Sequence, residues 1–316
     1  MAETVPLRLA TRGSPLARWQ ALRVQSLLSE VGVPSELVVV DTEGDRRSDL
    51  PLGALGGAGV FVKEIQYALL RGEADLAVHS AKDLPASSTV AVKGLTLAAV
   101  PERGDSSDVL VGATLESLSP GAIVATGSPR RRVQLAAVRP DLGFVELRGN
   151  LATRLAQVGV DGVTAVITAK AALDRLEWQA SPGLEFEILS PDVMVPQVGQ
   201  GALAVECRSD DVATLAAVAA IDRPAQRRLV EAERAFLATL GGGCTMPVGA
   251  WARYVEPGSP QLPSASTVIE LLAMLADEDR GVVVRKSAQG TDGDSVGQSL
   301  AEALLEDVPL AAPEHS

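Results

Sequence analysis

The chain has 316 residues, of which 47% are hydrophobic, 22% charged and only 3% aromatic, enough for two or three domains with aliphatic cores. Its net charge of −12 argues against a nucleic acid or an anionic membrane as partner. No apolar run approaches the roughly 18 residues of a membrane span, and the N-terminus lacks the basic flank of a signal peptide. We therefore expect a cytoplasmic protein.

Strands and helices alternate through the first two thirds of the chain. Residues 7–10 form a predicted strand, after which Ser14 is the predicted N-cap and Pro15 the first residue of a helix to about residue 29. Ser128 and Pro129 repeat that pair at a later helix. Further strands are predicted at 36–40, 75–79, 123–126, 144–147, 165–167 and 202–208, and a helix at 61–70. The alternation predicts α/β layers with largely parallel pairing.

Proline and glycine clusters divide the chain into domains. Residues 101–105 separate a first unit from a second, and residues 191–201 resemble a hinge that leads back to the first. A small α+β domain is predicted from helices at 225–240 and 295–305 and strands at 251–254, 267–274 and 282–286. We expect domain 1 at 1–101 with 199–221, domain 2 at 105–195, domain 3 at 222–308, and a flexible tail at 309–316.

One sequence pattern occurs twice. Thr-Arg-Gly-Ser-Pro at 11–15 and Thr-Gly-Ser-Pro at 126–129 each follow a predicted strand and open a helix that has arginines close by. Free backbone N–H groups, a hydroxyl and guanidinium groups at a helix N-terminus suit a carboxylate or phosphate. Two ordinary capped helices are the alternative. The repetition favours anion binding by two similar domains that face one cleft.

Basic residues gather at predicted strand ends despite the acidic total. They are Arg12, Lys63, Lys82, Arg130, Arg131, Arg132, Arg148, Arg154 and Arg175. Ligands of open α/β sheets bind at the carboxyl ends of strands, and arginine favours carboxylates through bidentate pairs. Each residue alone could be a solvated surface charge. Their joint placement predicts a cleft for a polyanionic small molecule.

Two polar residues mark the predicted strand at 75–79. Asp83 follows it in a turn, where its carboxylate could stabilise a developing cation or move protons, or could simply cap the turn. His79 lies on the apolar strand and is expected to be a packed core residue. Neither Ser-His-Asp catalysis nor a zinc site is expected. The sequence also has neither a P-loop nor a Gly-x-Gly-x-x-Gly fingerprint.

The two cysteines differ in their surroundings. Cys244 follows three glycines, with no histidine, acid or second cysteine nearby to make a thiolate or a metal site. Such a thiol suits stable covalent attachment better than turnover; a free cysteine in a helix-to-strand turn is the alternative. Cys207 lies in an alternating run and is expected to be a small core residue. Two such cysteines indicate reduced thiols.

Several motifs together resemble the porphobilinogen deaminase family, whose members are also called hydroxymethylbilane synthases. They occur in family order between residue 8 and about residue 250. The motifs are Ala-Thr-Arg-Gly-Ser-Pro-Leu-Ala at 10–17, Val-Phe-Val-Lys-Glu at 60–64, His-Ser-Ala-Lys-Asp-Leu-Pro at 79–85, Thr-Gly-Ser-Pro-Arg-Arg at 126–131, Leu-Arg-Gly-Asn at 147–150, Thr-Arg-Leu at 153–155, Val-Gly-Gln-Gly-Ala at 198–202 and Gly-Gly-Cys at 242–244.

The resemblance implies an α/β fold with two type 2 periplasmic-binding-protein-like domains and a small α+β C-terminal domain. It implies that Cys244 holds a covalent dipyrromethane cofactor, one per chain, built from substrate. Four porphobilinogen molecules are added to this primer with loss of ammonia, and the linear tetrapyrrole hydroxymethylbilane is released by hydrolysis. The implied protein is a transferase of haem and porphyrin biosynthesis, a monomer, whose partner is the small-molecule substrate.

The resemblance also assigns roles to single residues. Asp83 matches the catalytic aspartate, which interacts with pyrrole N–H groups and stabilises a methylene-pyrrolenine cation. Positions that match cofactor-binding residues are Lys82, Thr126, Ser128, Arg130, Arg131, Arg148 and Gln200. Positions that match substrate-binding residues are Arg12, Ser14, Lys63, Arg154 and Arg175. No metal is implied.

The chain departs from the common family pattern at three positions. Glu43 stands where many members have arginine, and Ala58 where many have lysine; both flank a loop at about 48–57 that is expected to cover the cleft. Gly127 replaces a common serine. Two other functions remain possible from the residues: a non-enzymatic solute-binding protein, and an enzyme that takes a phosphorylated substrate at the two helix N-termini.

Overall fold

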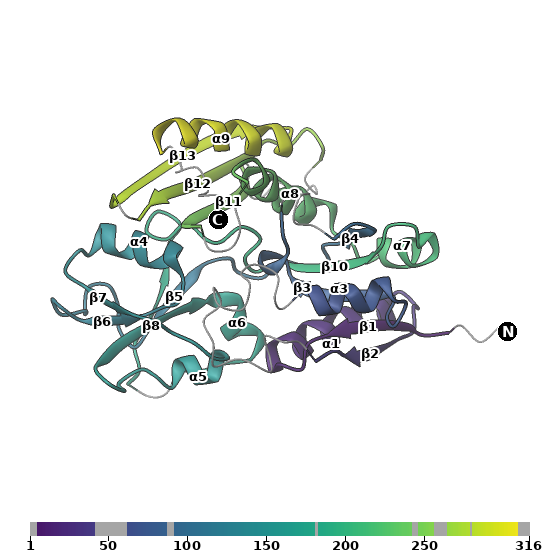
Figure 1. The fold of residues 1–316 in the computed structure, drawn as a ribbon, viewed down its shortest axis with the longest axis horizontal. Helices are drawn as coiled ribbons and strands as arrows, with labels where there is room; N and C mark the ends of the chain where they lie inside the picture. Colours follow the sequence, from purple (N-terminus) through teal and green to yellow (C-terminus); the bar gives the residue numbers. More distant parts are fainter. Residues whose placement is uncertain are drawn as a thin grey trace, which may run out of the picture.

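The structure is a computed structural model that describes residues 5–41, 62–86, 92–180, 183–241, 246–255, 264–278 and 280–308. Two mixed sheets and one antiparallel sheet organise these residues (Figure 1). The predicted cleft loop at 48–57, with Glu43 and Ala58 beside it, lies outside the described residues, and so does Cys244. None of the helices in the described part of the chain is long and apolar enough to cross a bilayer.

The first sheet has the strand order β2-β1-β3-β10-β4. Its strands are β1 (Leu7–Thr11), β2 (Ser35–Val39), β3 (Leu76–Ser80), β4 (Leu95–Ala99) and β10 (Leu203–Arg208). Strand β1 pairs in parallel with β2 and β3, whereas β10 runs antiparallel to β3 and β4. The helices that accompany this sheet are α1 (Pro15–Glu30), α3 (Lys63–Leu70) and α7 (Val212–Ala219).

The second sheet repeats this design with the order β7-β6-β8-β5-β9. Its strands are β5 (Asp108–Val111), β6 (Ile123–Ala125), β7 (Gly143–Val145), β8 (Val163–Ala169) and β9 (Phe186–Leu189), and its helices are α4 (Pro129–Val138), α5 (Leu151–Leu155) and α6 (Lys170–Arg175). Strand β5 takes the place that β10 has in the first sheet, antiparallel to its inner neighbour. Both sheets have the type 2 periplasmic-binding-protein arrangement expected from the sequence.

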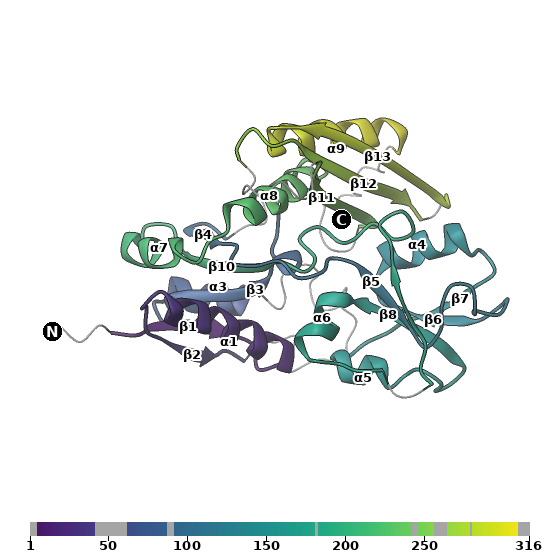
Figure 2. The same cartoon turned by 180° about the vertical axis from the view of Figure 1, so that it is seen from behind.

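Two chain crossings connect the two sheets. The first leads into β5, and the second leads back through residues 196–202 into β10. They meet where Arg103 pairs with Ala202 in an antiparallel bridge and the N–H of Gly104 donates to the carbonyl of Gly201 at 2.9 Å. A Cβ at Gly201, whose φ is +83°, would lie 2.5 Å from the Gly104 oxygen, so only glycine allows this approach. Figure 2 shows α1 and α6 meeting at this boundary.

The third sheet is an antiparallel meander of β11 (Val248–Tyr254), β12 (Ile269–Asp277) and β13 (Val282–Gly290). Helices α8 (Pro224–Thr239) and α9 (Gly293–Asp307) complete this domain (Figure 1). Its core is largely aliphatic around the fully buried ring of Phe236, and the partly buried Tyr254 packs against it. The two helices approach closely because Gly297 faces α8, where a Cβ would lie 2.5 Å from the Ala232 oxygen.

Most predicted elements are confirmed, although some strands differ from the prediction in their limits or in the direction of their pairing. The pairing is mixed rather than largely parallel, because β5 and β10 enter their sheets from the neighbouring domain. Strand β7 ends at Val145, short of the predicted limit, whereas β11 and β13 are longer than predicted. The elements that the sequence did not predict are β4, β5, β9 and α7. The strands among them are short apolar runs, which periodicity does not assign.

Candidate active site

The 3₁₀ turn Ala81–Asp83 follows β3 directly and carries Lys82 and Asp83, as the sequence predicted for a polar turn after a strand. The N–H of Ala81 donates to the carbonyl of Ala202 at 2.9 Å, which fixes the turn to the returning chain. Gly199, with φ +71°, lies so close that a Cβ there would be 3.1 Å from the Ala81 carbonyl carbon. Asp83 itself is exposed, so its carboxylate is available to a ligand.

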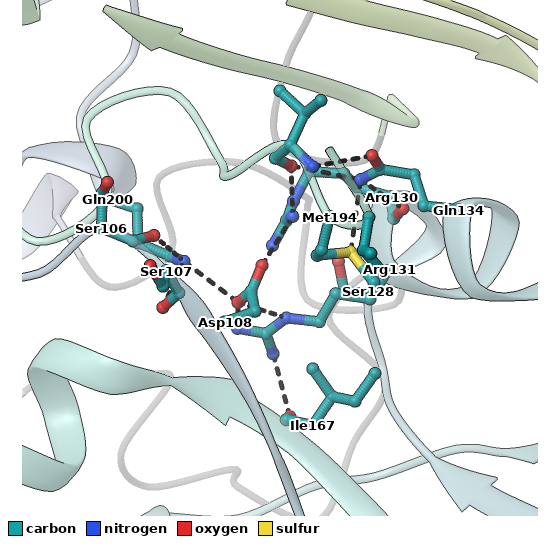
Figure 3. A network of polar contacts seen from close by, with 12 residues as sticks. Ser106, Ser107, Asp108, Ser128, Arg130, Arg131, Gln134, Ile167, Met194 and Gln200 are labelled. Atoms are coloured by element: carbon teal, nitrogen blue, oxygen red, sulfur yellow. Dashed lines mark hydrogen bonds and ion pairs between the residues drawn. The ribbon is translucent and has the colours of Figure 1, made fainter. Parts of the chain in front are cut away.

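Gln200 connects this turn to the second domain (Figure 3). Its Oε1 accepts a hydrogen bond from Lys82 Nζ at 3.2 Å, and its Nε2 donates to Asp108 Oδ1 at 3.0 Å and to the Ser106 carbonyl at 2.8 Å. Gln200 is fully buried, and protein atoms use both ends of its amide. Its observed role is therefore to join Lys82 to Asp108 across the domain boundary.

Arg130 and Arg131, in the first turn of α4, both pair with Asp108 at the start of β5 (Figure 3). Arg131 donates to Asp108 Oδ1 at 2.7 and 3.0 Å and to the carbonyl of Ile167, while Arg130 Nη1 lies 2.8 Å from Asp108 Oδ2. Burial alone would raise the pKa of Asp108, but the charges of the two arginines outweigh it and hold the pKa well below its ordinary value.

Positive charge is concentrated around Asp83. Burial lowers the pKa of Lys82 to about 8; Arg131 and Arg130 lower it further, against the opposing charges of Asp83 and Asp108. Burial and the charge of Arg131 lower the pKa of Arg154, whereas Asp83 raises it. These mutual effects mean that the structure brings Lys82, Asp83, Arg130, Arg131 and Arg154 together. A ligand with several carboxylates would relieve this repulsion.

The surroundings of Arg130 fit an additional anionic group. Its Nε and Nη2 are buried and have no hydrogen-bond partner among the described residues. Arg130 also lines a cavity of about 30 Å³ between the second domain, the hinge and the third domain, with Ser128, Gln197, Leu237 and Met246.

Four of the other predicted cationic residues have other protein partners or lie exposed at the surface. Arg148 is partly exposed and pairs with Glu146 at 3.2 Å. Arg175 is buried; it donates to the carbonyl of Gly201 at 2.6 Å and lies over the ring of Trp19, 5.4 Å from its centroid. Lys63 is exposed as the first residue of α3. Arg132 belongs to the domain interface, where it pairs with Glu278.

The two helix N-termini of the repeated motif differ from each other. Ser14 accepts a hydrogen bond from the N–H of Ala17, at 3.4 Å, as a predicted N-cap should, and Arg12 is half-buried beside it. Ser128 occupies the N-cap position of α4, but its side chain makes no capping bond to this fully described helix. Its N–H instead donates to Oγ1 of the buried Thr126 at 3.2 Å. The predicted N-cap position of Ser128 is therefore confirmed without a capping hydrogen bond, and its hydroxyl remains available to a ligand.

The glycine at position 127 has a steric cause. A Cβ there would lie 2.8 Å from the carbonyl oxygen of Leu147. This backbone has no room for the serine that is common in the family, so the departure reflects the path of the chain after β7.

Two residues that the sequence analysis assigned to the core lie there. His79 is buried and its Nε2 lies 2.9 Å from Glu206, which also accepts from Gln66. Cys207 is fully buried, and burial raises the pKa of its thiol to about 11, which makes it unreactive at neutral pH.

Sequence reasoning missed the acidic residues that organise this region. Asp108 directly precedes the apolar run Val-Leu-Val in β5. An acidic residue at the start of such a run was the feature of the sequence that could have indicated a buried, paired carboxylate. Glu233 lies among the buried residues Leu229 and Phe236 of α8, where its Oε1 accepts a hydrogen bond from Nη1 of Arg103 at 2.8 Å. A carboxylate within the apolar face of a helix needs a buried partner.

The fold and the site thus define a protein with two α/β domains, a small α+β third domain, and a cluster of cationic side chains at the boundary between the two α/β domains. Residues 7–216 match the family model "Porphobilinogen deaminase, dipyromethane cofactor binding domain", and residues 228–306 match "Porphobilinogen deaminase, C-terminal domain". The chain belongs to the porphobilinogen deaminase family. The family consists of transferases that bind dipyrromethane, so the chain is an enzyme of this class.

Relatives that align over nearly their full length are named porphobilinogen deaminase. A porphobilinogen deaminase of Acidothermus cellulolyticus is 44% identical, covering 98% of this chain and 92% of the relative. One of Xanthomonas euvesicatoria is 41% identical over 95% and 96% of the two chains. Among solved structures, a probable amino-acid transporter binding protein from Bacillus subtilis has a TM-score of 0.43 at 9% identity, covering 69% of this chain and 90% of that one.

Proposed function

We propose that the protein is a hydroxymethylbilane synthase. In this reaction four porphobilinogen molecules are joined, with loss of ammonia, on a dipyrromethane carried by Cys244, and the tetrapyrrole is released by hydrolysis. The observation that carries the proposal is the chain of contacts from Lys82 through Gln200 and Asp108 to Arg130 and Arg131, next to the turn that bears the exposed carboxylate of Asp83. Arg154 interacts electrostatically with both Arg131 and Asp83. This arrangement suits a substrate with two carboxylates and a cationic reaction intermediate.

The cofactor and the substrate have different holders in this proposal. The dipyrromethane supplies the pyrrole carbon to which new units are joined. Arg130, Arg131, Lys82, Ser128 and Thr126 are proposed to bind its carboxylates, and the unpartnered N–H groups of Arg130 support this assignment. Gln200 and Arg148 complete the proposed cofactor set. Arg154 is proposed to bind substrate, together with Arg12, Ser14, Lys63 and Arg175.

Asp83 is the proposed catalytic residue. Breaking the C–N bond of porphobilinogen releases ammonia and leaves a cationic methylene-pyrrolenine. A fixed carboxylate nearby lowers the barrier to this charge separation. The bound dipyrromethane would supply the pyrrole carbon that forms the new C–C bond, with loss of the proton from that carbon. The carboxylate of Asp83 orients the pyrrole N–H as a hydrogen-bond acceptor throughout.

The Asp83→Asn variant tests this role. The neutral amide keeps the size of the side chain and loses its charge, so we expect folded protein that has nearly lost formation of tetrapyrrole from porphobilinogen. Asp105→Asn is the matched control, because Asp105 is an exposed aspartate that caps a turn by accepting the N–H of Ser107 at 2.8 Å. Retention of more than about a tenth of wild-type turnover would mean that less than ~1.4 kcal/mol of barrier was lost. Asp83 would then be a turn-capping residue.

Attachment of the cofactor is tested separately by intact-mass measurement. We expect wild-type protein and Cys207→Ala to carry the mass of two linked pyrrole units, and Cys244→Ala to have the mass of the bare chain. The burial of Cys207 supports this assignment between the two thiols. An adduct that disappears in Cys207→Ala would contradict it.

We also propose that the enzyme works as a cytoplasmic monomer. Its net charge of −12 and its reduced, buried Cys207 support a reducing compartment and a protein that stays apart from nucleic acids and anionic membranes. Sedimentation velocity at micromolar concentration would test the oligomeric state.

A further inference from the structure

A residue of the third domain holds the chain just beyond Asp83. Arg234 lies on α8, half-buried, and its Nη2 donates to the carbonyl of Pro85 at 2.7 Å. Its Nη1 makes a longer hydrogen bond, of 3.4 Å, to the carbonyl of Leu84. Leu84 and Pro85 follow Asp83 directly in the chain. The third domain thus contacts the backbone directly after the catalytic turn.

The same turn is held from its other side by the hinge. Gln197 Nε2 donates to the carbonyl of Lys82 at 3.4 Å, and Ala81 is bonded to Ala202. The carbonyls of Lys82, Leu84 and Pro85 therefore all accept hydrogen bonds from side chains that belong to other parts of the molecule. Because Pro85 has no N–H of its own, the backbone cannot anchor itself there through a donor. Side chains outside domain 1 thus supply hydrogen bonds before and after Asp83, in addition to the bond from the N–H of Leu84 to the carbonyl of Ala81, at 3.2 Å, that closes the turn.

The charge of Arg234 is balanced where it lies. Burial lowers the pKa of its guanidinium, whereas the negative charges of Glu206 and Glu231 raise it. An arginine remains protonated in proteins, so its two donors are available at any working pH. The planar fork allows one side chain to reach two successive carbonyls, which an ammonium group does less well.

We propose that Arg234 is a positioning residue for Asp83, acting through the carbonyls of Leu84 and Pro85. This inference rests on the proposed function, because it presumes that Asp83 is the catalytic carboxylate. Without the two bonds, the segment that follows Asp83 loses its side-chain anchors, and the carboxylate samples positions away from the developing cation.

Arg227 provides a matched control on the same helix. It also donates to two carbonyls of domain 1, those of Leu97 at 3.1 Å and Ala98 at 2.7 Å, and it pairs with Asp222 at 2.9 Å. Leu97 and Ala98 belong to β4, whereas the Arg234 acceptors follow the catalytic turn. Arg227→Gln therefore removes the same kind of contact between domains without touching the turn.

The experiment compares Arg234→Gln, Arg234→Lys and Arg227→Gln at a temperature where thermal melts show all three folded. A misplacement of about 1 Å can cost about 100-fold in rate. We therefore expect Arg234→Gln to lower kcat by about 10- to 100-fold, with KM for porphobilinogen within about twofold of wild type. Arg234→Lys should recover part of the loss, since an ammonium can still reach Pro85. Arg227→Gln should keep wild-type kcat, although it melts at a lower temperature.

A double variant shows whether Arg234 acts through Asp83. The rate of the first covalent addition of porphobilinogen, followed by intact mass, should fall no further when Arg234→Gln is added to Asp83→Asn. An equal loss in both backgrounds would overturn the proposal. So would an effect of Arg234→Gln on KM alone, a kcat within twofold of wild type, or equal kcat losses in Arg234→Gln and Arg227→Gln. Wild-type turnover in Asp83→Asn is a different result: it would leave the proposed activity standing and overturn the catalytic role of Asp83 together with this inference.

Discussion

Asp108 balances two guanidinium groups at once, although it lies outside the motifs that identify the family. Its Oδ1 faces Arg131 and Gln200, and its Oδ2 faces Arg130. The carboxylate is fully buried, so its charge is stable only because of these partners. Loss of this one charge would leave two buried cations beside Lys82, which is already repelled by both.

We expect Asp108→Asn to lower the free energy of unfolding at pH 7 by about 3–5 kcal/mol, because removal of one partner leaves buried charge uncompensated. The pKa of Asp108 is lowered in the folded protein. Its stabilisation is therefore fully present above the unfolded pKa of about 4, and is lost as pH falls through the lower folded value. Urea titrations should show the same loss of free energy of unfolding, relative to wild type, at pH 7 and pH 5. The loss should be smaller at pH 3. Asp141→Asn, which removes an exposed partner of Arg139, should behave like wild type.

The lowered pKa of Lys82 predicts an activity that falls as pH rises, whereas the stability that Asp108 provides falls as pH drops. Burial lowers its pKa to about 8, so the free enzyme loses this positive charge as pH rises through that value. If the ammonium binds a substrate carboxylate, kcat/KM for porphobilinogen should fall above about pH 8, since this ratio reports the free enzyme. Lys82→Arg should keep its charge and shift the fall to higher pH.

Lys170→Arg serves as the control for this profile, because Lys170 is paired with Asp174 on α6 and has no contact with the turn. Its pH profile should match wild type. Identical alkaline limbs in wild type and Lys82→Arg would assign the titration to another group.

The sequence predicted the cationic residues of the site but not the acidic residue that pairs with them. Lys82, Arg130, Arg131 and Arg154 follow strand ends, and parallel sheets bring such ends together. Asp108 reaches Arg131 only because β5 inserts antiparallel beside β8, a pairing between residues 108–111 and 166–169. Local patterns contain no information on such a long-range pairing. Arg175 was assigned to the cleft for the same reason as the others, yet it binds Gly201 and Trp19 at the domain boundary.

At the scale of single elements, α1 and α4 differ in how they begin. Both have serine at the N-cap and proline next, but only Ser14 accepts a bond from the first turn. We expect Ser14→Ala to cost about 1 kcal/mol in the free energy of unfolding, in the range of measured N-cap losses. Ser128→Ala should leave stability nearly unchanged and reduce cofactor loading. Urea unfolding and intact mass of the two variants would check this, and equal losses of stability would contradict it.

The elements that sequence patterns predicted are those with strong local signals. Helix α1 has a cap, a proline and helical periodicity, and its predicted limits are nearly those observed. Strand β4, Leu95–Ala99, lacks such a signal because it is a five-residue apolar run at a sheet edge. Its identity as a strand depends on pairing with β10, which lies more than 100 residues away. Tertiary contacts, which a local pattern does not contain, decide such segments.

At the scale of the whole molecule, Glu233 joins all three domains. Its carboxylate accepts both Arg103 Nη1 and Nη2, at 2.8 and 3.1 Å, from the first crossing. It also accepts the N–H of Gly199 at 2.7 Å from the second crossing, and that of Ala252 at 2.9 Å from β11. One fully buried side chain thus holds both crossings against the third domain.

Glu233→Gln should therefore loosen the attachment between domains. The glutamine amide places an N–H donor where four N–H donors converge, and Arg103 loses its counter-charge. We therefore expect the free energy of unfolding to fall by about 3–5 kcal/mol. Calorimetry should show a lower melting temperature and a separate transition for the third domain. Glu231→Gln, which alters a half-exposed residue of the same helix, should melt as wild type. A single unshifted transition in Glu233→Gln would show that the domains are held together by other contacts.

The position of β10 has a consequence for synthesis on the ribosome. This strand lies between β3 and β4, so a sheet that begins at Leu7 is completed only when Leu203–Arg208 has been made. The second sheet, continuous from Asp108 to Leu189, is finished earlier. The later-made half can therefore fold first, which inverts the usual N-terminal-first order. Until then the nascent chain exposes the unpaired edges of β3 and β4, which are open to pairing with other chains and to capture by chaperones.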